Sequence, residues 1–180
     1  MKSTLITGGA RSGKSHLAQE LALKSGGAVL FVATAEAGDE EMKRRIEEHK
    51  KARPATWVTL EANTHLGSQI SRNIGQAQTV IIDCITLLIN NILQQHDEET
   101  DAALIEKEVM AEIDGLITCI DRVDASFIIV TNEVGLGLVP ANKLGRSYRD
   151  LLGRANQVLA QHADEVYLMV AGLPLRIKPA

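Results

Sequence analysis

The sequence predicts a single α/β domain over residues 1–180, with a mostly parallel sheet covered by helices on both faces. Some segments are apolar throughout, such as Ser126–Thr131 (S-F-I-I-V-T), which is typical of strands buried on both faces. Segments with helical periodicity separate these strands, as the crossover connections of a parallel sheet require. A length of 180 residues also fits one domain.

The first third of the chain alternates between strand and helix. Thr4–Thr7 is a short apolar run and predicts a buried strand. Ser15–Lys24 has helical spacing and is followed by a Gly-Gly pair that ends helices. Ala28–Thr34 (A-V-L-F-V-A-T) predicts the second strand, and the charged segment Asp39–Ala52 predicts a helix that an Arg-Pro pair closes.

The middle of the chain continues this alternation. Trp57–Leu60 alternates like a strand, and Leu66–Gly75 predicts a short helix. Thr79–Ile82 is a buried strand, and a helix follows it to about Gln95. Asp101 to Arg122 carries apolar residues at helical spacing, which predicts the next helix.

The last third begins with the apolar strand Ser126–Thr131. Asn142–His162 is long and amphipathic, and its first residue is a favoured helix cap. Glu165–Val170 and Leu175–Lys178 read as strands that pair with one another. The sequence therefore predicts strands and helices almost from end to end.

Composition excludes several classes of protein. The 19 Lys and Arg against 23 Asp and Glu give a net charge of −4, which argues against general affinity for nucleic acid but not against a local basic patch. Cys84 and Cys119 are too few for a disulfide scaffold or a four-cysteine zinc site, so we expect buried thiols in a reducing compartment. Asp83, Asn90 and Asn91 interrupt the longest apolar run, so we expect a soluble, cytoplasmic protein without a signal peptide or membrane span.

The first strand leads into a phosphate-binding motif. Residues 8–15, G-G-A-R-S-G-K-S, contain the pattern G-x-x-x-x-G-K-S between a strand and a helix. Its glycines let backbone N–H groups face a phosphate, Lys14 reaches the terminal phosphates, and the Ser15 hydroxyl can hold Mg²⁺. The alternative is a glycine-rich turn without a ligand. The predicted phosphate-binding residues are Gly8, Gly9, Ala10, Arg11, Ser12, Gly13, Lys14 and Ser15, in a RecA-like P-loop NTPase domain.

Acidic residues follow two other predicted strands. Asp83 ends T-V-I-I-D and is expected either to hold Mg²⁺ or to cap the next helix. Glu133 ends S-F-I-I-V-T-N-E and is a rival for the metal, or for activating a hydroxyl group or water. Ligands of open α/β sheets collect at the carboxyl ends of parallel strands, where both carboxylates would lie.

His49 lies in a strongly charged helical segment, R-I-E-E-H-K-K-A-R-P. It shares one side of the predicted helix with Met42 and Ile46, which fits a partly buried histidine on an inner stripe. The neighbouring cations would instead keep its imidazole neutral and attract a polyphosphate. A neutral histidine beside a nucleotide can form a covalent phosphohistidine or nucleotidyl-histidine intermediate, which a simple P-loop kinase does not need.

Three segments resemble a known family. They are T-G-G-A-R-S-G-K-S, R-I-x-x-H-K-x-x-R-P-x-x-W and V-T-N-E-V-G-x-G-x-V-P. The likeness covers the whole chain and is to the bifunctional adenosylcobinamide kinase / adenosylcobinamide-phosphate guanylyltransferases of cobalamin biosynthesis. The resemblance implies phosphorylation of adenosylcobinamide from ATP or GTP. It also implies transfer of GMP from GTP onto that phosphate, giving adenosyl-GDP-cobinamide and pyrophosphate.

The resemblance also implies roles for particular residues. His49 takes the place of the family's guanylylated histidine, and Lys14 that of its P-loop lysine. The implied nucleotide contacts beyond the P-loop are Thr34, Ala35, Glu36, Lys50, Lys51, Ala52, Arg53, Glu61 and Asp83. Asp83 and Glu61 could each accept hydrogen bonds from guanine, which gives Asp83 a role besides Mg²⁺. The family also implies a homotrimer, while the net charge of −4 and the 3% aromatic content argue against a nucleic-acid partner.

Other features keep two interpretations. Val134–Asn142 is either a plain β–α loop that ends in an Asn cap or a mobile wall for a bulky acceptor. Arg146, Arg149 and Arg154 are either solvated or salt-bridged cations, or phosphate ligands. Two other functions also remain open at this point: a small-molecule kinase without nucleotidyl transfer, and a RecA-like ATPase or binding module.

Overall fold

The computed structural model describes residues 2–35, 40–51, 53–97 and 99–179. It contains one seven-stranded sheet in the order β3-β2-β4-β5-β1-β6-β7. The strands are β1 Ser3–Gly8, β2 Val29–Ala33, β3 Val58–Glu61, β4 Thr79–Asp83, β5 Ser126–Val130, β6 Glu165–Val170 and β7 Leu173–Lys178. Every neighbouring pair is parallel except β6 with β7, so the predicted mostly parallel α/β sheet is confirmed.

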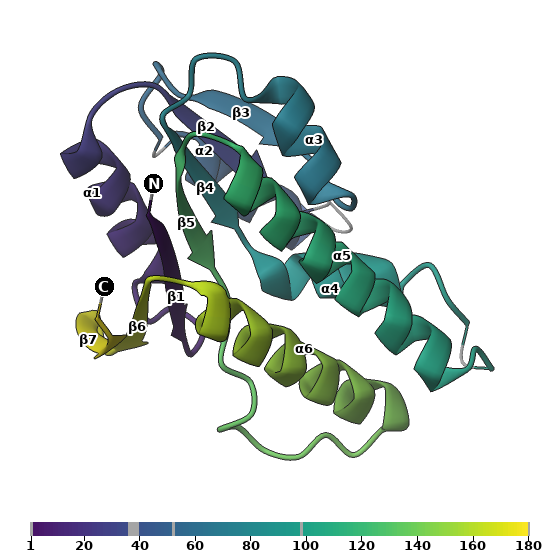
Figure 1. Ribbon diagram of the computed structural model, residues 1–180. Coiled ribbons are helices and arrows are strands. Elements are labelled where there is room, and N and C mark those ends of the chain that lie inside the picture. The colour runs from purple at the N-terminus through teal and green to yellow at the C-terminus, as the bar shows by residue number, and fades with distance from the viewer. Residues whose placement is uncertain (1, 36–39, 52, 98, 180) are drawn as a thin grey trace.

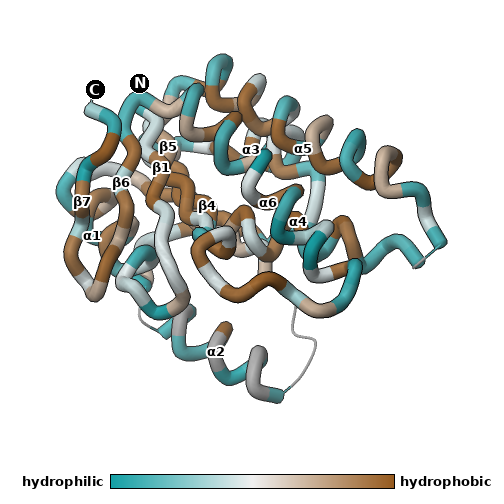
Figure 2. Tube along the Cα trace, turned by 90° about the horizontal axis from the view of Figure 1, so that it is seen from below, coloured by the Kyte–Doolittle hydropathy of each residue, from teal (hydrophilic) through white to brown (hydrophobic). Residues whose placement is uncertain are grey.

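Helices cover both faces of this sheet (Figure 1). They are α1 Lys14–Ser25, α2 Glu40–Lys51, α3 Leu66–Asn73, α4 Ile85–Leu93, α5 Ala102–Arg122 and α6 Lys143–His162. Figure 2 shows α2 on the opposite side of the strands from α3 and α5. Within the described residues, no helix combines the length and the apolarity needed to cross a bilayer.

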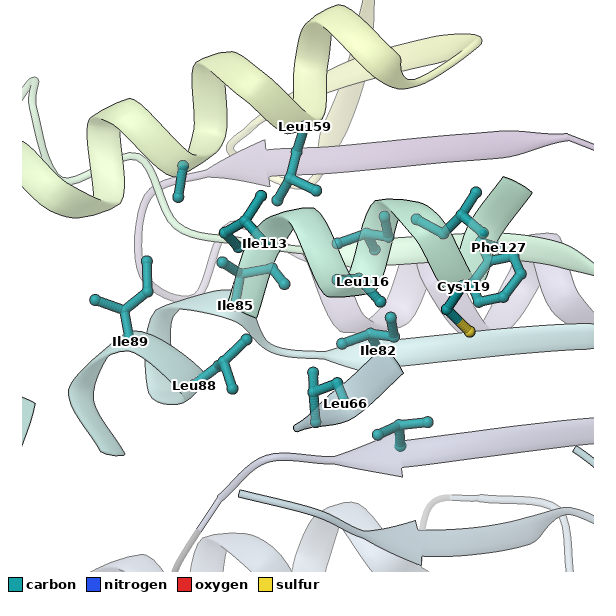
Figure 3. Close-up of a cluster of buried hydrophobic side chains, with 14 of the residues drawn as sticks. Leu66, Ile82, Ile85, Leu88, Ile89, Ile113, Leu116, Cys119, Phe127 and Leu159 are labelled. Carbon is teal, nitrogen blue, oxygen red and sulfur yellow. The ribbon is translucent and has the colours of Figure 1, made fainter. Parts of the chain in front are cut away.

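Two clusters of buried side chains hold these layers together. The larger lies between the sheet and α3 to α6, and it includes Ile82, Leu116 and Phe127 (Figure 3). The smaller lies on the other face, where Phe31 and Ile81 pack with Leu17 of α1. Strands β1 and β2 are buried along their whole length because both faces are covered, which explains their continuous apolar sequence.

The observed boundaries differ from the expected ones mainly at the last strand. The pairing of the last two strands is confirmed, but β7 begins at Leu173 and not at Leu175. Pro174 lies within β7, opposite Met169. An edge strand tolerates proline because one side of its backbone needs no ladder partner, and this was not expected from the sequence.

The strand register brings the ends of β1, β2, β4 and β5 to one edge of the sheet. Ala33 pairs with Asp83, and Asp83 pairs with Val130. The backbone N–H of Glu133 donates to the carbonyl oxygen of Gly8 at 3.0 Å. Segments that are far apart in the sequence therefore meet at this edge, where the candidate site lies.

Candidate active site

Residues 8–15 join β1 to the amino terminus of α1, as the motif requires. Lys14 is buried, and its Nζ donates to the carbonyl oxygen of Gly9 at 2.6 Å. Burial lowers the pKa of Lys14, while the nearby Cys84 and Asp83 side chains act in the opposite direction. The loop thus holds a partly desolvated cation beside backbone N–H groups, which is suited to binding an anion.

The end of β6 and the turn that follows it pack against this loop. Gly8 has φ of 147°, and a Cβ there would lie 2.5 Å from the carbonyl oxygen of Met169 in β6. The N–H of Gly172 donates to the carbonyl oxygen of Ser12 at 3.1 Å. Only glycine permits the first of these close approaches, so the C-terminal hairpin and the loop fit together closely.

Asp83 ends β4 between two cations. It is half-buried, and its charge acts on both Lys14 and Arg53. Cys84, not Asp83, occupies the N-cap position of α4, so helix capping does not account for this carboxylate. The structure therefore brings Asp83 next to the P-loop lysine and to the end of the histidine-bearing segment.

Arg53 is the least satisfied cation of the site. Its Nε and Nη1 are buried and have no hydrogen-bond partner among the described residues. Its Cζ lies 3.6 Å from the ring centroid of Phe31, and that ring stacks with Trp57 at 6.5 Å between centroids. Burial lowers the pKa of Arg53, while Asp83 and Glu61 oppose the shift. A guanidinium with free N–H donors whose neighbour Asp83 also acts on the P-loop lysine is a candidate phosphate ligand.

A cavity of about 370 Å³ opens between the end of α2 and the ends of β2 and β3. Its lining includes Ala33, Ala35, Ile46, Lys50, Glu61 and Asn63. Lys50 and Glu61 form an ion pair across it. This volume lies within the range of small-molecule sites, and the cavity combines apolar walls with one charged pair.

Other predicted site residues either form hydrogen bonds within the chain or are exposed. Thr34 is fully buried, and its Oγ1 bonds to the backbone carbonyl and N–H of Cys84 at 2.7 Å each. Glu133 Oε1 accepts from the N–H of Gly135 at 2.9 Å. Arg11 and Lys51 are exposed, and Ser15 is half-buried at the start of α1.

Three of the predicted residues are not described in full. Glu36 and Ala52 lie outside the described residues. The backbone of His49 belongs to α2, but its side chain is likewise outside them. Position 49 lies three residues after Ile46, which lines the cavity, so the two positions share a side of the helix.

The three arginines of α6 make contacts within the chain. Arg146 donates to the carbonyl oxygens of Pro140 and Ala141, and Arg149 to that of Gly135. Arg154 forms an ion pair with Glu106 of α5. These contacts give each arginine a structural role without a phosphate, because they hold the loop before α6 and join α6 to α5.

The described residues contain no cluster of three or more His, Cys, Asp or Glu side chains that could hold a metal ion. Ser15 and Asp83 supply one hydroxyl and one carboxylate at the P-loop edge. That small donor set fits Mg²⁺, which usually keeps several waters and takes its other ligands from substrate phosphates.

Sequence reasoning missed the ring beneath Arg53. Phe31 lies in the middle of an apolar strand and gives no sign of a role beyond the core. The only available signal was the short spacing from Arg53 to Trp57, which places a cation and an aromatic ring in one loop.

Comparisons with known proteins agree on one family. The family described as "Cobinamide kinase / cobinamide phosphate guanyltransferase" matches residues 4–177. The "Bifunctional adenosylcobalamin biosynthesis protein CobU" of Salmonella typhimurium is 42% identical over 179 residues, covering 97% of this chain and 98% of that protein. The protein of the same name from Escherichia coli is 41% identical with the same coverage. "Bifunctional adenosylcobalamin biosynthesis protein CobP" of Pseudomonas aeruginosa is 41% identical over 174 residues, covering 97% and 96%.

Among solved structures, the RadB recombinase has a similar fold. Its TM-score is 0.51 at 14% sequence identity, with 93% of this chain and 73% of that chain covered. At this identity the likeness concerns the fold alone, which is that of RecA-family P-loop proteins. The predicted RecA-like architecture is therefore confirmed.

Proposed function

The chain belongs to the cobinamide kinase / cobinamide phosphate guanyltransferase family, and on that premise we propose that it catalyses both transfers on adenosylcobinamide, within one catalytic domain spanning residues 1–180. The surroundings of Asp83 carry the proposal, because its charge acts both on the buried Lys14 of the P-loop and on Arg53, whose Nε and Nη1 have no hydrogen-bond partner among the described residues. Such a set binds and positions a nucleoside triphosphate.

In the first reaction, the hydroxyl oxygen of the aminopropanol arm attacks the γ-phosphorus of ATP or GTP. The bond from that phosphorus to the β,γ-bridging oxygen breaks, the nucleoside diphosphate leaves, and the hydroxyl proton passes to a base. Lys14 offsets the charge that develops on the phosphates, and Asp83 or Glu133 is the carboxylate available to receive the proton. Such positioning supplies most of the catalysis in phosphoryl transfer.

In the second reaction, a ring nitrogen of His49 attacks the α-phosphorus of GTP, and pyrophosphate leaves. A phosphate oxygen of adenosylcobinamide phosphate then attacks the same phosphorus, the phosphorus–nitrogen bond breaks, and adenosyl-GDP-cobinamide forms. The position of residue 49 supports this role, since it shares a side of α2 with the cavity-lining Ile46. A covalent histidine intermediate divides one difficult transfer into two displacements.

The nucleotide would contact residues on both sides of the 370 Å³ cavity and the P-loop. We propose that Arg53 turns from the ring of Phe31 toward a phosphate, and that Glu61 or Asp83 accepts from the guanine edge. Lys50, which is paired with Glu61 in the structure, would then release this carboxylate. Thr34 and Ala35 would shape the wall of the site, and Glu36, Lys51 and Ala52 complete the proposed contacts.

Three further properties belong to the proposal. Ser15 and Asp83 would hold Mg²⁺ together with the phosphates, and this ion neutralises charge on the transferred group. The protein would work in the cytoplasm, where the two unpaired buried cysteines, Cys84 and Cys119, remain thiols. By likeness to the family it would assemble as a homotrimer.

The test is incubation with GTP labelled at the α-phosphate, followed by denaturation and detection of protein-bound label. We expect an acid-labile, base-stable adduct in the wild type and in His65→Asn, and none in His49→Asn. His65 is a matched control because it is an exposed histidine whose φ of 54° asparagine tolerates. Label that persists in His49→Asn would overturn the assignment of the nucleophile, and a wild type without label would overturn the guanylyl transfer.

A further inference from the structure

The loop between β5 and α6 exposes apolar side chains beside the candidate site. Leu136 and Leu138 are 84% and 96% exposed, and Val139 is exposed as well. Figure 2 shows hydrophobic residues along much of this loop, on the face seen from below. Contiguous exposed apolar groups of this kind commonly mark a binding surface.

The same loop is held in place at both ends. Arg149 donates to the carbonyl oxygen of Gly135 at 2.7 Å, and Arg146 donates to that of Ala141 at 2.6 Å. Asn142 caps α6, since its Oδ1 accepts from the N–H of Gly145 at 2.6 Å. The apolar groups are therefore presented by a loop with fixed ends, and a fixed loop loses little freedom when it binds a ligand.

A cavity of about 550 Å³ lies where α4 ends and where α5 and α6 begin. Its apolar lining comes from Leu93, Ile105, Leu144 and Leu151. Leu144 lies two residues after the cap of α6 and is 55% exposed, so it joins the cavity to the apolar loop. Cavity and loop thus form one continuous surface.

The charged side chains of this cavity are mostly acidic. Asp97, Glu106 and Asp150 line it together with one ammonium group, that of Lys143. Glu106 is paired with Arg154, which leaves two carboxylates against one ammonium. A nucleotide polyphosphate would be repelled here, whereas a cation or an amide N–H donor would be favoured.

The cavity is close to the P-loop but separate from the nucleotide cavity. Leu93 lines it and ends α4, whose first residue, Ile85, comes two positions after Asp83. From Ile85 to Leu93 there are eight helical steps of 1.5 Å, which place the cavity about 12 Å from the end of the sheet that carries the P-loop. The apolar loop bridges this interval, since the N–H of Glu133 near its start donates to the carbonyl oxygen of Gly8, and Asn142 at its end lines the cavity.

We propose that this cavity and the apolar loop bind the corrinoid acceptor, with the macrocycle on the loop and its aminopropanol arm directed at the P-loop. The inference rests on the proposed function, which supplies the acceptor. An alkylated cobalt(III) corrin bears a net positive charge, a large apolar ring and peripheral carboxamides. Each of these features has a counterpart here: carboxylates for charge and amide N–H groups, and Leu136, Leu138 and Leu144 for the ring.

Two variants and a matched control test this surface. Ser147→Trp places an indole in the cavity, and Leu144→Gln removes an apolar contact from its rim without adding charge. Leu23→Gln is the control, because Leu23 is a helical leucine with 59% exposure on α1, on the other face of the sheet. Equilibrium dialysis would measure the dissociation constant of adenosylcobinamide for the whole protein, while the GTP-labelling assay follows nucleotide use.

We expect Ser147→Trp to raise the corrinoid dissociation constant about tenfold or more and Leu144→Gln about fivefold. GTP labelling should stay at the wild-type level in all three proteins, and Leu23→Gln should bind corrinoid normally. Wild-type corrinoid affinity in both cavity variants would overturn the proposal, and a change in sedimentation without a change in that affinity would assign the surface to contacts between copies. If the wild type neither binds nor phosphorylates adenosylcobinamide, the proposed function itself fails and the inference falls with it.

Discussion

Arg53 is a buried cation whose Nε and Nη1 lack hydrogen-bond partners among the described residues. Stacking on Phe31 offsets part of the desolvation cost of its guanidinium, but leaves those N–H donors unused. An unsatisfied buried donor is tolerated where it serves a ligand, since the ligand completes the hydrogen bonds. We therefore expect Arg53 to contribute little to the stability of the fold and much to nucleotide binding.

The variant Arg53→Met separates these two effects. Methionine keeps a flexible stem over the Phe31 ring and removes the unpaired cation, so the free energy of unfolding should stay within about 1 kcal/mol of wild type. The dissociation constant of GTP should rise roughly tenfold or more, because charge-assisted hydrogen bonds are lost. Urea unfolding and GTP titration measure the two quantities. A large loss of stability with normal GTP binding would show that Arg53 is a packing residue.

Cys84 lies close to Lys14 of the P-loop, but its thiol should react slowly with alkylating agents. Burial raises the pKa of its thiol from 9.0 to about 11. A shift of two units reduces the thiolate fraction at pH 8 about 100-fold, and the thiolate is the form that reacts. Alkylation of folded protein with iodoacetamide should therefore be at least about 100-fold slower than that of protein unfolded in urea, with peptide mapping to separate Cys84 from Cys119. Equal rates in the two states would contradict this burial.

At the level of elements, α3 and α5 cross at a pair of glycines. A Cβ on Gly67 would lie 2.3 Å from the carbonyl oxygen of Gly115, whereas a Cβ on Gly115 would meet nothing within 4 Å. The two backbones thus approach closely from one side only. This crossing fixes α3 against the larger core cluster, where Leu66 and Ile70 are fully buried.

Alanine at these two positions should have opposite effects. Gly67→Ala should lower the free energy of unfolding by roughly 1–3 kcal/mol, since the helices must separate. Gly115→Ala should raise it by roughly 0.5–1 kcal/mol, because alanine is the better helix former. Urea denaturation of both variants gives the comparison, and each variant is the other's control. Equal losses of stability at both positions would contradict the one-sided contact.

The elements were predictable from the sequence because their signals are local. Continuously apolar strands, apolar residues at helical spacing, and a glycine or proline after α1, α2 and α3 place the strands and helices to within a few residues, as for β4 and α5. The P-loop was predictable for the same reason, since all its residues are contiguous. The pairing order was harder, because nothing local says that β4 lies between β2 and β5.

The site beyond the P-loop depended on resemblance and on folding. The stack of Arg53 on Phe31 joins residues 22 positions apart, and the nearby Trp57 indicates only that an aromatic ring lies close to Arg53, not that Phe31 does. The hydrogen-bond partners of Arg146 and Arg149 could not be predicted either, because they are backbone carbonyls of an irregular loop. Contacts of this kind follow from loop conformation, which sequence periodicity does not encode.

At the scale of the whole molecule, polar contacts tie the first strand to the last ones. The carboxylate of Asp164 accepts from the N–H and the hydroxyl of Ser3 at 2.8 and 3.0 Å. Glu165 pairs with Lys2 at 2.8 Å and with Arg176 at 3.2 Å. Hydrogen bonds from the backbone and side chain of Ser3 hold the pKa of Asp164 below 3.8, and the hydrogen bond from Lys2 lowers that of Glu165 below 4.5.

These contacts should make the free energy of unfolding depend on pH in the acidic range. A carboxyl group with a lowered pKa in the folded state stabilises that state at pH values above its unfolded pKa, and loses the effect as pH falls through the folded one. Asp164→Asn should therefore be less stable than wild type at pH 7, and the difference should shrink as pH falls below about 4. Urea midpoints from pH 7 to pH 3 measure it. Asp124→Asn, at an exposed aspartate outside these contacts, is the control. A difference that stays constant with pH would contradict the linkage.

The bond from the N–H of Gly172 to the carbonyl oxygen of Ser12 also has a consequence for synthesis. The phosphate loop leaves the ribosome early, but the turn that supports it follows 160 residues later, as the numbering of the two residues shows. A nascent chain halted before that turn has the complete P-loop motif but lacks the hydrogen bond from Gly172 that holds it. We therefore expect a nascent chain to bind nucleotide tightly only after it has been translated past Gly172.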